Sequence, residues 1–323
     1  MELNKLDFAN KVQDQTIYDL LFNNYELLGK DWIAHQWIWI NGVYKAFEDH
    51  IKFFIVISLV EKTLNFYHQV NITKNYDDFY SSSFLQIEKF SITELCEKLD
   101  LPKETVRRKV LELEKIGVIK RTKKQIIIDR NAFPYVKPIE QIPLTSKYIV
   151  KVSELLGNDK MYSKKFDAKF AEKVIKKNFS LCWRWFYRMQ IPVMIGYQKI
   201  FNDLSTFHIW GTIGMNQAFN YKINFEELGK DYNKFNKILL SNTNDKETSG
   251  VSAMSISDMT KIPRATVIRK CKFLMKNNYV QMNEKKQYFL SGKNTEKILP
   301  YQKEFFKKKA RFLTRILNLI AIS

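Results

Sequence analysis

The sequence predicts a mainly helical protein in which a unit of two helices and a small β wing occurs twice, each joined to its own helical support. Three observations lead to this prediction. Residues 91–128 combine an amphipathic helical pattern with a basic outer face and a basic hairpin. The same pattern returns at residues 252–289, and each copy follows a long stretch rich in aromatic residues.

In the first copy, two helices are predicted around a tight corner. SITELCEKLD has apolar residues at helical spacing, and a corner ending at Pro102 follows. Pro102 suits the first turn of the second helix, because its missing N–H would be unpaired there anyway. The second helix places Val106, Val110 and Leu113 on one buried stripe, and Gly117 suits the left-handed residue that ends a helix.

The segment after Gly117, VIKRTKKQIIID, is typical of a strand, a basic turn and a second strand. Helix, turn, helix and a two-stranded wing is the winged helix-turn-helix arrangement, which lays its second helix in the DNA major groove. The expected DNA contacts are the polar residues that fall off the buried stripe and those of the wing: Lys103, Glu104, Thr105, Arg107, Arg108, Lys120, Arg121, Lys123 and Lys124.

The second copy aligns with the first without a gap at an offset of 161 residues, which predicts an internal duplication. Pro102/Pro263, Thr105/Thr266, Val106/Val267, Arg108/Arg269, Lys109/Lys270 and Leu113/Leu274 are identical pairs. The corresponding DNA contacts are expected at Arg264, Ala265, Thr266, Arg269, Lys285 and Lys286.

The segment KETVRRKV resembles the recognition helix of the cyclic-AMP receptor protein family and, more loosely, that of MarR-like regulators. Thr105, Val106 and Arg108 carry the resemblance, which covers the two wing-bearing units and neither family's sensor nor dimerisation parts. It implies that Lys103, Glu104 and Arg108 read bases, with Arg264 and Arg269 as their partners in the second copy. Ala265 replaces Glu104 there, so the second copy departs from the pattern.

Charge points to a polyanionic partner, either nucleic acid or an anionic membrane surface. The net charge is +19, although part of the lysine excess is consistent with a codon bias towards A·T. Arginine is more informative, because five of the ten arginines lie in residues 91–128 and 252–289, which make up under a quarter of the chain. We therefore expect double-stranded DNA as the partner.

Composition shifts divide the chain into six predicted parts. They are a helical support (1–89), a winged helix-turn-helix (90–130), a Pro-containing linker (131–146), a second helical support (147–249), a second winged helix-turn-helix (250–292) and a C-terminal amphipathic helix (293–323). A weaker echo at an offset of 154 links the aromatic helices 37–68 and 190–221, including the pair Asp49/Asp203. We expect these helices to pair as the centre of a pseudo-dimer, and they also offer a surface for self-association.

Catalytic, metal and cofactor sites are not predicted. The four histidines show no ligand spacing, and the sequence has no nucleotide-binding or nucleophile motif. An odd count of three cysteines suits a reduced cytoplasmic protein, and the expected DNA binding would make it nucleoid-associated. No run is long enough for a membrane span. The aromatic helices could line a pocket for a small-molecule effector, but packing explains them more simply.

These observations favour a sequence-specific DNA-binding protein without enzymatic activity, and most of all a bacterial transcription regulator in which one chain reads two unequal half-sites. Two alternatives stay open. Tandem winged helices in one chain also resemble the arrangement of a plasmid- or phage-type replication initiator. A non-catalytic interaction scaffold would use the same units without DNA.

Overall fold

The computed structural model describes residues 11–88, 91–122, 125–132, 137–158, 161–220, 231–233, 250–291 and 295–323. These residues are mainly helical and include two small three-stranded antiparallel sheets. The predicted fold class, mainly α with small β wings, is confirmed at this level.

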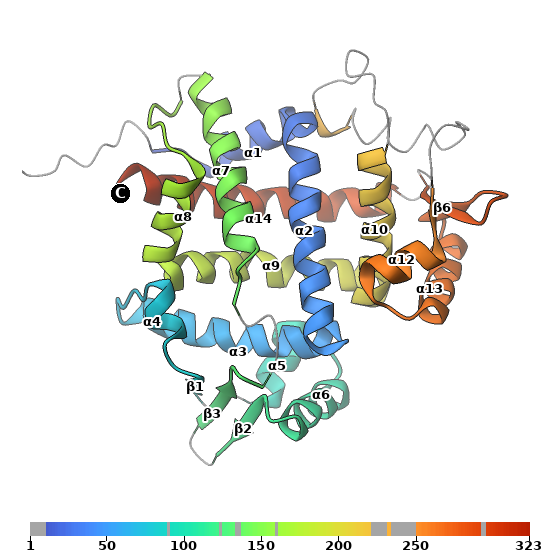
Figure 1. The fold of residues 1–323 in the computed structure, drawn as a ribbon, viewed down its shortest axis with the longest axis horizontal. Coiled ribbons are helices and arrows are strands. Elements are labelled where there is room, and N and C mark those ends of the chain that lie inside the picture. Colours follow the sequence, from blue (N-terminus) through green and yellow to red (C-terminus); the bar gives the residue numbers. More distant parts are fainter. Residues whose placement is uncertain are drawn as a thin grey trace, which may run out of the picture.

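Four long helices form the centre of the molecule (Figure 1). They are α2 (Tyr25–Phe47), α3 (His50–Gln69), α9 (Phe179–Phe201) and α10 (Leu204–Asn220). Helix α3 lies along α9, and α10 lies along α2. Their buried faces are aromatic and aliphatic, which explains why these stretches are apolar on most sides. The aromatic helices predicted from the sequence therefore pair within one chain.

Each central pair is joined by the same kind of corner. The residue after α2, Glu48, adopts a left-handed conformation, and Asp49 then caps the N-terminus of α3 by accepting hydrogen bonds from two backbone amides. Asn202 after α9 is also left-handed, and Asp203 accepts a 2.8 Å hydrogen bond from the backbone amide of Thr206 in α10. The two corners thus use equivalent aspartates.

The outer helices cross between the two halves of the chain. The C-terminal helix α14 (Thr295–Ala321) packs along α1 (Asp14–Asn23), and α7 (Gln141–Asn158) packs along α8 (Ala168–Lys177). A reciprocal pair of hydrogen bonds joins Asn318 of α14 to the backbone of Val12, at 2.9 and 3.0 Å. A short helix, α4 (Tyr76–Tyr80), covers α9 and α8.

The order and bounds of the helices repeat along the chain. At an offset of 154 residues, α1 corresponds to α8 and α2 to α9 at both ends, and α3 corresponds to α10 at its start. The equivalent residues Gln36 and Gln190 meet in the centre, where the Gln190 side-chain amide donates a 2.5 Å hydrogen bond to the Gln36 side-chain oxygen. The two halves are therefore arranged about an approximate two-fold axis.

The first wing-bearing unit consists of β1 (Phe84–Glu88), α5 (Ile92–Leu99), α6 (Lys103–Lys115), β2 (Ile119–Arg121) and β3 (Gln125–Asp129). Ser91 and Glu94 form a capping box at the start of α5. The predicted left-handed residue is present, because Gly117 has a φ of 80°. The sheet order is β1-β3-β2.

Strand β1 differs from the sequence-based division, which placed it in the helical support. It pairs with the whole of β3, and Leu85 and Ile87 are buried. Alternate burial along a strand explains why this segment joins the sheet. The unit consequently begins at Phe84 and has three strands, where two were expected.

Residues 250–291 form a second unit of the same design. It contains β4 (Val251–Ser252), α12 (Ala253–Thr260), α13 (Arg264–Lys276), β5 (Val280–Met282) and β6 (Gln287–Leu290), with the sheet order β4-β6-β5. The first unit packs on α3 and the second on α10, so the two units occupy corresponding places on the central helices.

The linker predicted at 131–146 is shorter than expected, because α7 already begins at Gln141. Pro143 is compatible with this helix, since the first turn needs no backbone donor. Helix α14 lies within the predicted range 293–323. None of the helices in the described ranges is both long enough and apolar enough to cross a membrane.

Candidate nucleic-acid interface

Helix α6 has one buried and one solvent-facing side. Val106, Val110 and Leu113 are fully buried against the rest of the first unit. Lys103, Arg107, Arg108 and the acidic Glu104 are exposed, and Thr105 is half-buried. The predicted base- and phosphate-contacting positions therefore share one open helical face.

Within the described part of the chain, these exposed cations form few contacts with carboxylates. The closest carboxylate to Arg108 is Glu112, whose oxygen lies 3.8 Å from Arg108 Nε, and the Arg108 side chain is 64% exposed. Such a contact is worth at most about 1 kcal/mol. No ion pair of Lys103 or Arg107 occurs among the described residues. These groups are available to a polyanion.

Lys109, which neighbours this face, has a structural role instead. Its ammonium lies 2.7 Å from Asp49 and 3.1 Å from Glu112, and its side chain is only 16% exposed. Burial lowers the pKa of Lys109, but the hydrogen bonds to the two carboxylates outweigh burial and raise it. Asp49 also caps α3, so this contact fixes α6 relative to α3.

The second unit repeats this contact. Lys270 of α13 forms an ion pair with Asp203, which caps α10. Burial raises the pKa of the Asp203 carboxyl, but hydrogen bonds from Lys270 and Thr206 outweigh burial and hold the pKa below its usual range. Both α6 and α13 are thus anchored through an equivalent lysine to an equivalent helix-capping aspartate.

Two basic residues in the wing of the first unit contact other residues of the same unit. Lys120 lies 3.4 Å from Asp129 and 5.4 Å from the Phe84 ring centroid. The Arg121 guanidinium forms two hydrogen bonds with the Glu114 carboxylate. Arg121 would have to exchange this partner for a phosphate. The other two predicted wing contacts, Lys123 and Lys124, lie outside the described residues.

The predicted contacts of the second unit are arranged in the same way. Arg264, Ala265 and Arg269 are exposed on α13, and Thr266 is half-buried. Lys285 and Lys286 are exposed in the turn between β5 and β6.

The two outer helical faces differ in charge. Helix α6 contains five basic and three acidic residues, whereas α13 contains five basic and none acidic. Two equivalent positions differ in chemistry: Glu104 corresponds to Ala265, and Arg107 to the half-buried Ile268. The faces are therefore related in position but not in what they can recognise.

Sequence reasoning missed the role of Asp49 and Asp203 as anchors. The signal was present, because Asp49/Asp203 and Lys109/Lys270 are both identical pairs. A further contact, between Lys199 of α9 and Asp100 in the corner before α6, measures 2.9 Å. The second unit cannot form an equivalent ion pair, because the position of Asp100 is occupied there by Lys261, which is positively charged.

Residues 84–126 match the model of the DeoR-like helix-turn-helix domain. This match runs from β1 into β3 and thus covers the first unit. No curated protein and no solved structure matches the chain. The matching model is not that of the cyclic-AMP receptor or MarR-like families, so the finer resemblance of the recognition helix gains no support. The first unit is a DeoR-like helix-turn-helix domain with a small wing sheet, a type of domain that indicates DNA binding.

Proposed function

We propose that this protein is a sequence-specific double-stranded DNA-binding protein that regulates transcription and acts by binding, without catalysis. The observation that carries the proposal is the open basic face of α6 within a DeoR-like helix-turn-helix domain. A helix of this kind reads base edges in the major groove, while Arg and Lys contacts to phosphates supply affinity.

The second part of the proposal is that residues 250–291 form a second winged helix-turn-helix that arose by internal duplication. Three features support it: the same order of elements, the same sheet order and the same lysine–aspartate anchor. One chain would then present two reading helices about its approximate two-fold axis. The paired aromatic helices take the place of a dimer interface.

The two readers would recognise different half-sites. Glu104 can accept a hydrogen bond from cytosine N4, whereas Ala265 can only contact a thymine methyl group. Arg107 can reach a phosphate or a base, whereas Ile268 offers only apolar contact. The preferred site should therefore be an imperfect repeat whose halves differ.

A replication initiator is the second candidate, because two readers held in one chain also suit repeated origin sites. A genome-wide binding map separates the two roles. Isolated sites near promoters support the regulator, and clustered direct copies near an origin support the initiator.

The first test is the salt dependence of DNA binding in a mobility-shift titration. If about six phosphates are neutralised, log K should fall with log salt at a slope of roughly −5. A flat response would contradict DNA binding and favour an interaction scaffold.

The second test uses in vitro site selection with matched variants. Arg108→Ala and Arg269→Ala should each cost about 1–3 kcal/mol and relax specificity in one half-site. Lys173→Ala, which removes an exposed cation of α8, serves as the control and should leave the selected site unchanged. Glu104→Ala should make the halves more alike; a perfect palindrome that this change leaves untouched would contradict two readers in one chain.

A further inference from the structure

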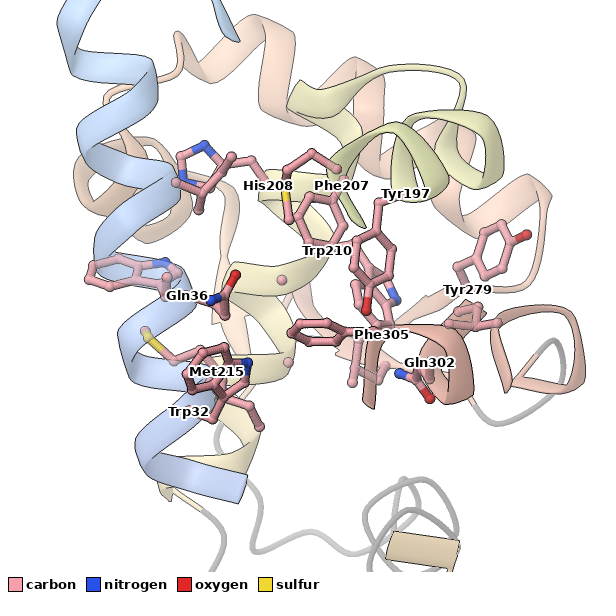
Figure 2. Close-up of a pocket in the computed structure, with 18 of the residues that line it drawn as sticks. Trp32, Gln36, Tyr197, Phe207, His208, Trp210, Met215, Tyr279, Gln302 and Phe305 are labelled. Carbon is pink, nitrogen blue, oxygen red and sulfur yellow. The ribbon is translucent and has the colours of Figure 1, made fainter. Parts of the chain in front are cut away.

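A cavity lies between the central helices and the base of the second wing-bearing unit. It has a volume of about 160 Å³, and its lining comes from α2, α9, α10, β6 and α14. Its walls are mostly apolar and include many aromatic rings, as Figure 2 shows for Trp32, Tyr197, Phe207, Trp210 and Phe305. The aromatic helices therefore do more than pack, and they enclose a space.

Two glycines of α10 create this space. Gly211 and Gly214 line the cavity, and at the offset of 154 they correspond to Ile57 and Val60 of α3. Within the described part of the chain, a Cβ built on Gly211 meets no atom within 4 Å, and the nearest atoms to one built on Gly214 belong to Leu290.

The corresponding place in the first half is nearly filled. Ile57 and Val60 line a cavity of only about 30 Å³ there, together with Phe79 and Tyr80 of α4. The two halves thus differ in a feature that packing alone would not require. The second half has glycines where the first half has the larger Ile57 and Val60.

Two hydrogen-bond donors at this cavity have no acceptor in the described part of the chain. The indole Nε1 of Trp32 is buried and makes no hydrogen bond. The Lys309 side chain is 2% exposed, and no carboxylate within the described ranges forms an ion pair with it. Its ammonium lies 4.3 Å from the Trp32 ring centroid and 4.7 Å from that of Tyr148.

A buried lysine that contacts aromatic rings but has no carboxylate partner among the described residues is costly. Burial lowers the pKa of Lys309 well below its usual range, because a charge without a partner is disfavoured away from water. A ligand that brings a negative charge would supply the missing partner and would also accept a hydrogen bond from Trp32.

We propose that this cavity binds a small aromatic carboxylate, with the ring among the aromatic walls and the carboxylate accepting hydrogen bonds from Trp32 Nε1 and Lys309 Nζ. The size is appropriate, since an apolar cavity of about 150 Å³ accommodates a benzene ring. The combination of apolar walls and few polar groups is typical of small-molecule sites.

Ligand binding at this site would affect the second unit. Leu290 of β6 and Tyr279, which precedes β5, both line the cavity. The backbone amide of Leu290 also donates a 3.0 Å hydrogen bond to Gln217 of α10. An occupied cavity would therefore bias the seating of α13 and change DNA affinity, a consequence that rests on the proposed function.

The binding test is a thermal-shift titration of the full chain with benzoate, toluene and benzylamine. A ligand that binds the folded state stabilises it in proportion to ln(1 + [L]/Kd). We expect benzoate to raise the Tm most, toluene less, and benzylamine not at all, because an ammonium cannot accept the hydrogen bonds that Trp32 and Lys309 would donate. Failure of both benzoate and toluene to bind at millimolar concentration would overturn the proposal, as would tighter binding of benzylamine.

Three variants locate the site. Gly211→Leu fills the cavity and should abolish binding of both benzoate and toluene, whereas Gly211→Ala should weaken it less. Lys309→Met removes the charge at similar volume and should raise the Kd for benzoate at least tenfold while sparing toluene. Trp32→Phe removes the other hydrogen-bond donor and tests the same carboxylate contact if Lys309→Met folds poorly. Undiminished benzoate binding by Gly211→Leu would overturn the assignment.

The link to DNA has a separate readout. Mobility-shift titrations with and without saturating benzoate should give different affinities for the selected site. If benzoate binds the protein and the affinity for DNA does not change, the cavity remains a ligand site but the coupling is wrong. If the protein binds no DNA at all, the proposed function fails while the thermal-shift result still decides the cavity.

Discussion

The Asp203 carboxylate has two roles, in contacts to Thr206 and to Lys270, that can be separated by mutation. It caps α10 through the Thr206 backbone amide at 2.8 Å, and it anchors α13 through Lys270. Loss of an N-cap costs about 1 kcal/mol. The ion pair has side chains 37% and 21% exposed, so after solvent screening it contributes about 0.5–1 kcal/mol. Asp203→Ala should therefore lower the free energy of unfolding by about 1.5–2 kcal/mol.

A double-mutant cycle isolates the anchor. Lys270→Met alone should cost about 0.5–1 kcal/mol, and the double variant should cost no more than Asp203→Ala, because the pair is already broken. The assay is urea unfolding followed by tryptophan fluorescence. Strictly additive losses would refute the anchor. The matched cycle on Asp49 and Lys109 should give a smaller coupling, since Lys109 keeps Glu112 as a second partner.

The remaining predictions concern the histidines and the glycines. Burial lowers the pKa of His35 to about 3 and of His50 to about 4, so both are neutral in the fold. Stability should be fully present above pH 6.5 and should fall as the pH drops towards 4, by up to about 1.4 kcal/mol per pH unit for each histidine; a flat urea midpoint across this range would contradict the burial. Gly211→Ala should raise the free energy of unfolding by about 0.5–1 kcal/mol, as its Cβ has free space. Gly117→Ala should lower it by about 1 kcal/mol, because Gly117 has a φ of 80°; the same urea series measures both, and equal shifts would contradict the backbone argument.

The helices of the first unit could be predicted because their signals are local. Helical spacing in α6, a proline at its start and Gly117 at its end all act within a few residues, so each independently predicts the same helix. Strand β1 could not be predicted in this way. Its partner β3 begins 37 residues later, from Glu88 to Gln125, and FLQIE lacks any turn signal that would connect the two.

A pocket among the aromatic helices was an alternative that the sequence left open, but its position in the second half could not be predicted, for a different reason. It depends on two absent side chains, at Gly211 and Gly214, and a missing contact leaves no pattern along the chain. Lys309 is equally hidden in sequence, because it is the last of three consecutive lysines. Helical geometry turns only one of them inward, and Lys307 and Lys308 are not buried. The lysine–aspartate anchors were also hard to predict, because Asp49/Asp203 and Lys109/Lys270 repeat at different sequence offsets and only the fold brings each lysine to its aspartate.

The crossing of the outer helices has a consequence for assembly. Because α14 packs on both α1 and α9, and α7 on both α8 and α2, each outer helix joins the two halves of the chain. The halves also belong to one covalent molecule, so dilution cannot separate them. If both units read DNA, occupancy should follow a simple hyperbola down to the lowest protein concentrations, whereas a dimeric reader loses affinity once its subunits dissociate. The spacing of the two half-sites would then be a fixed property of the chain, independent of how much protein a cell contains.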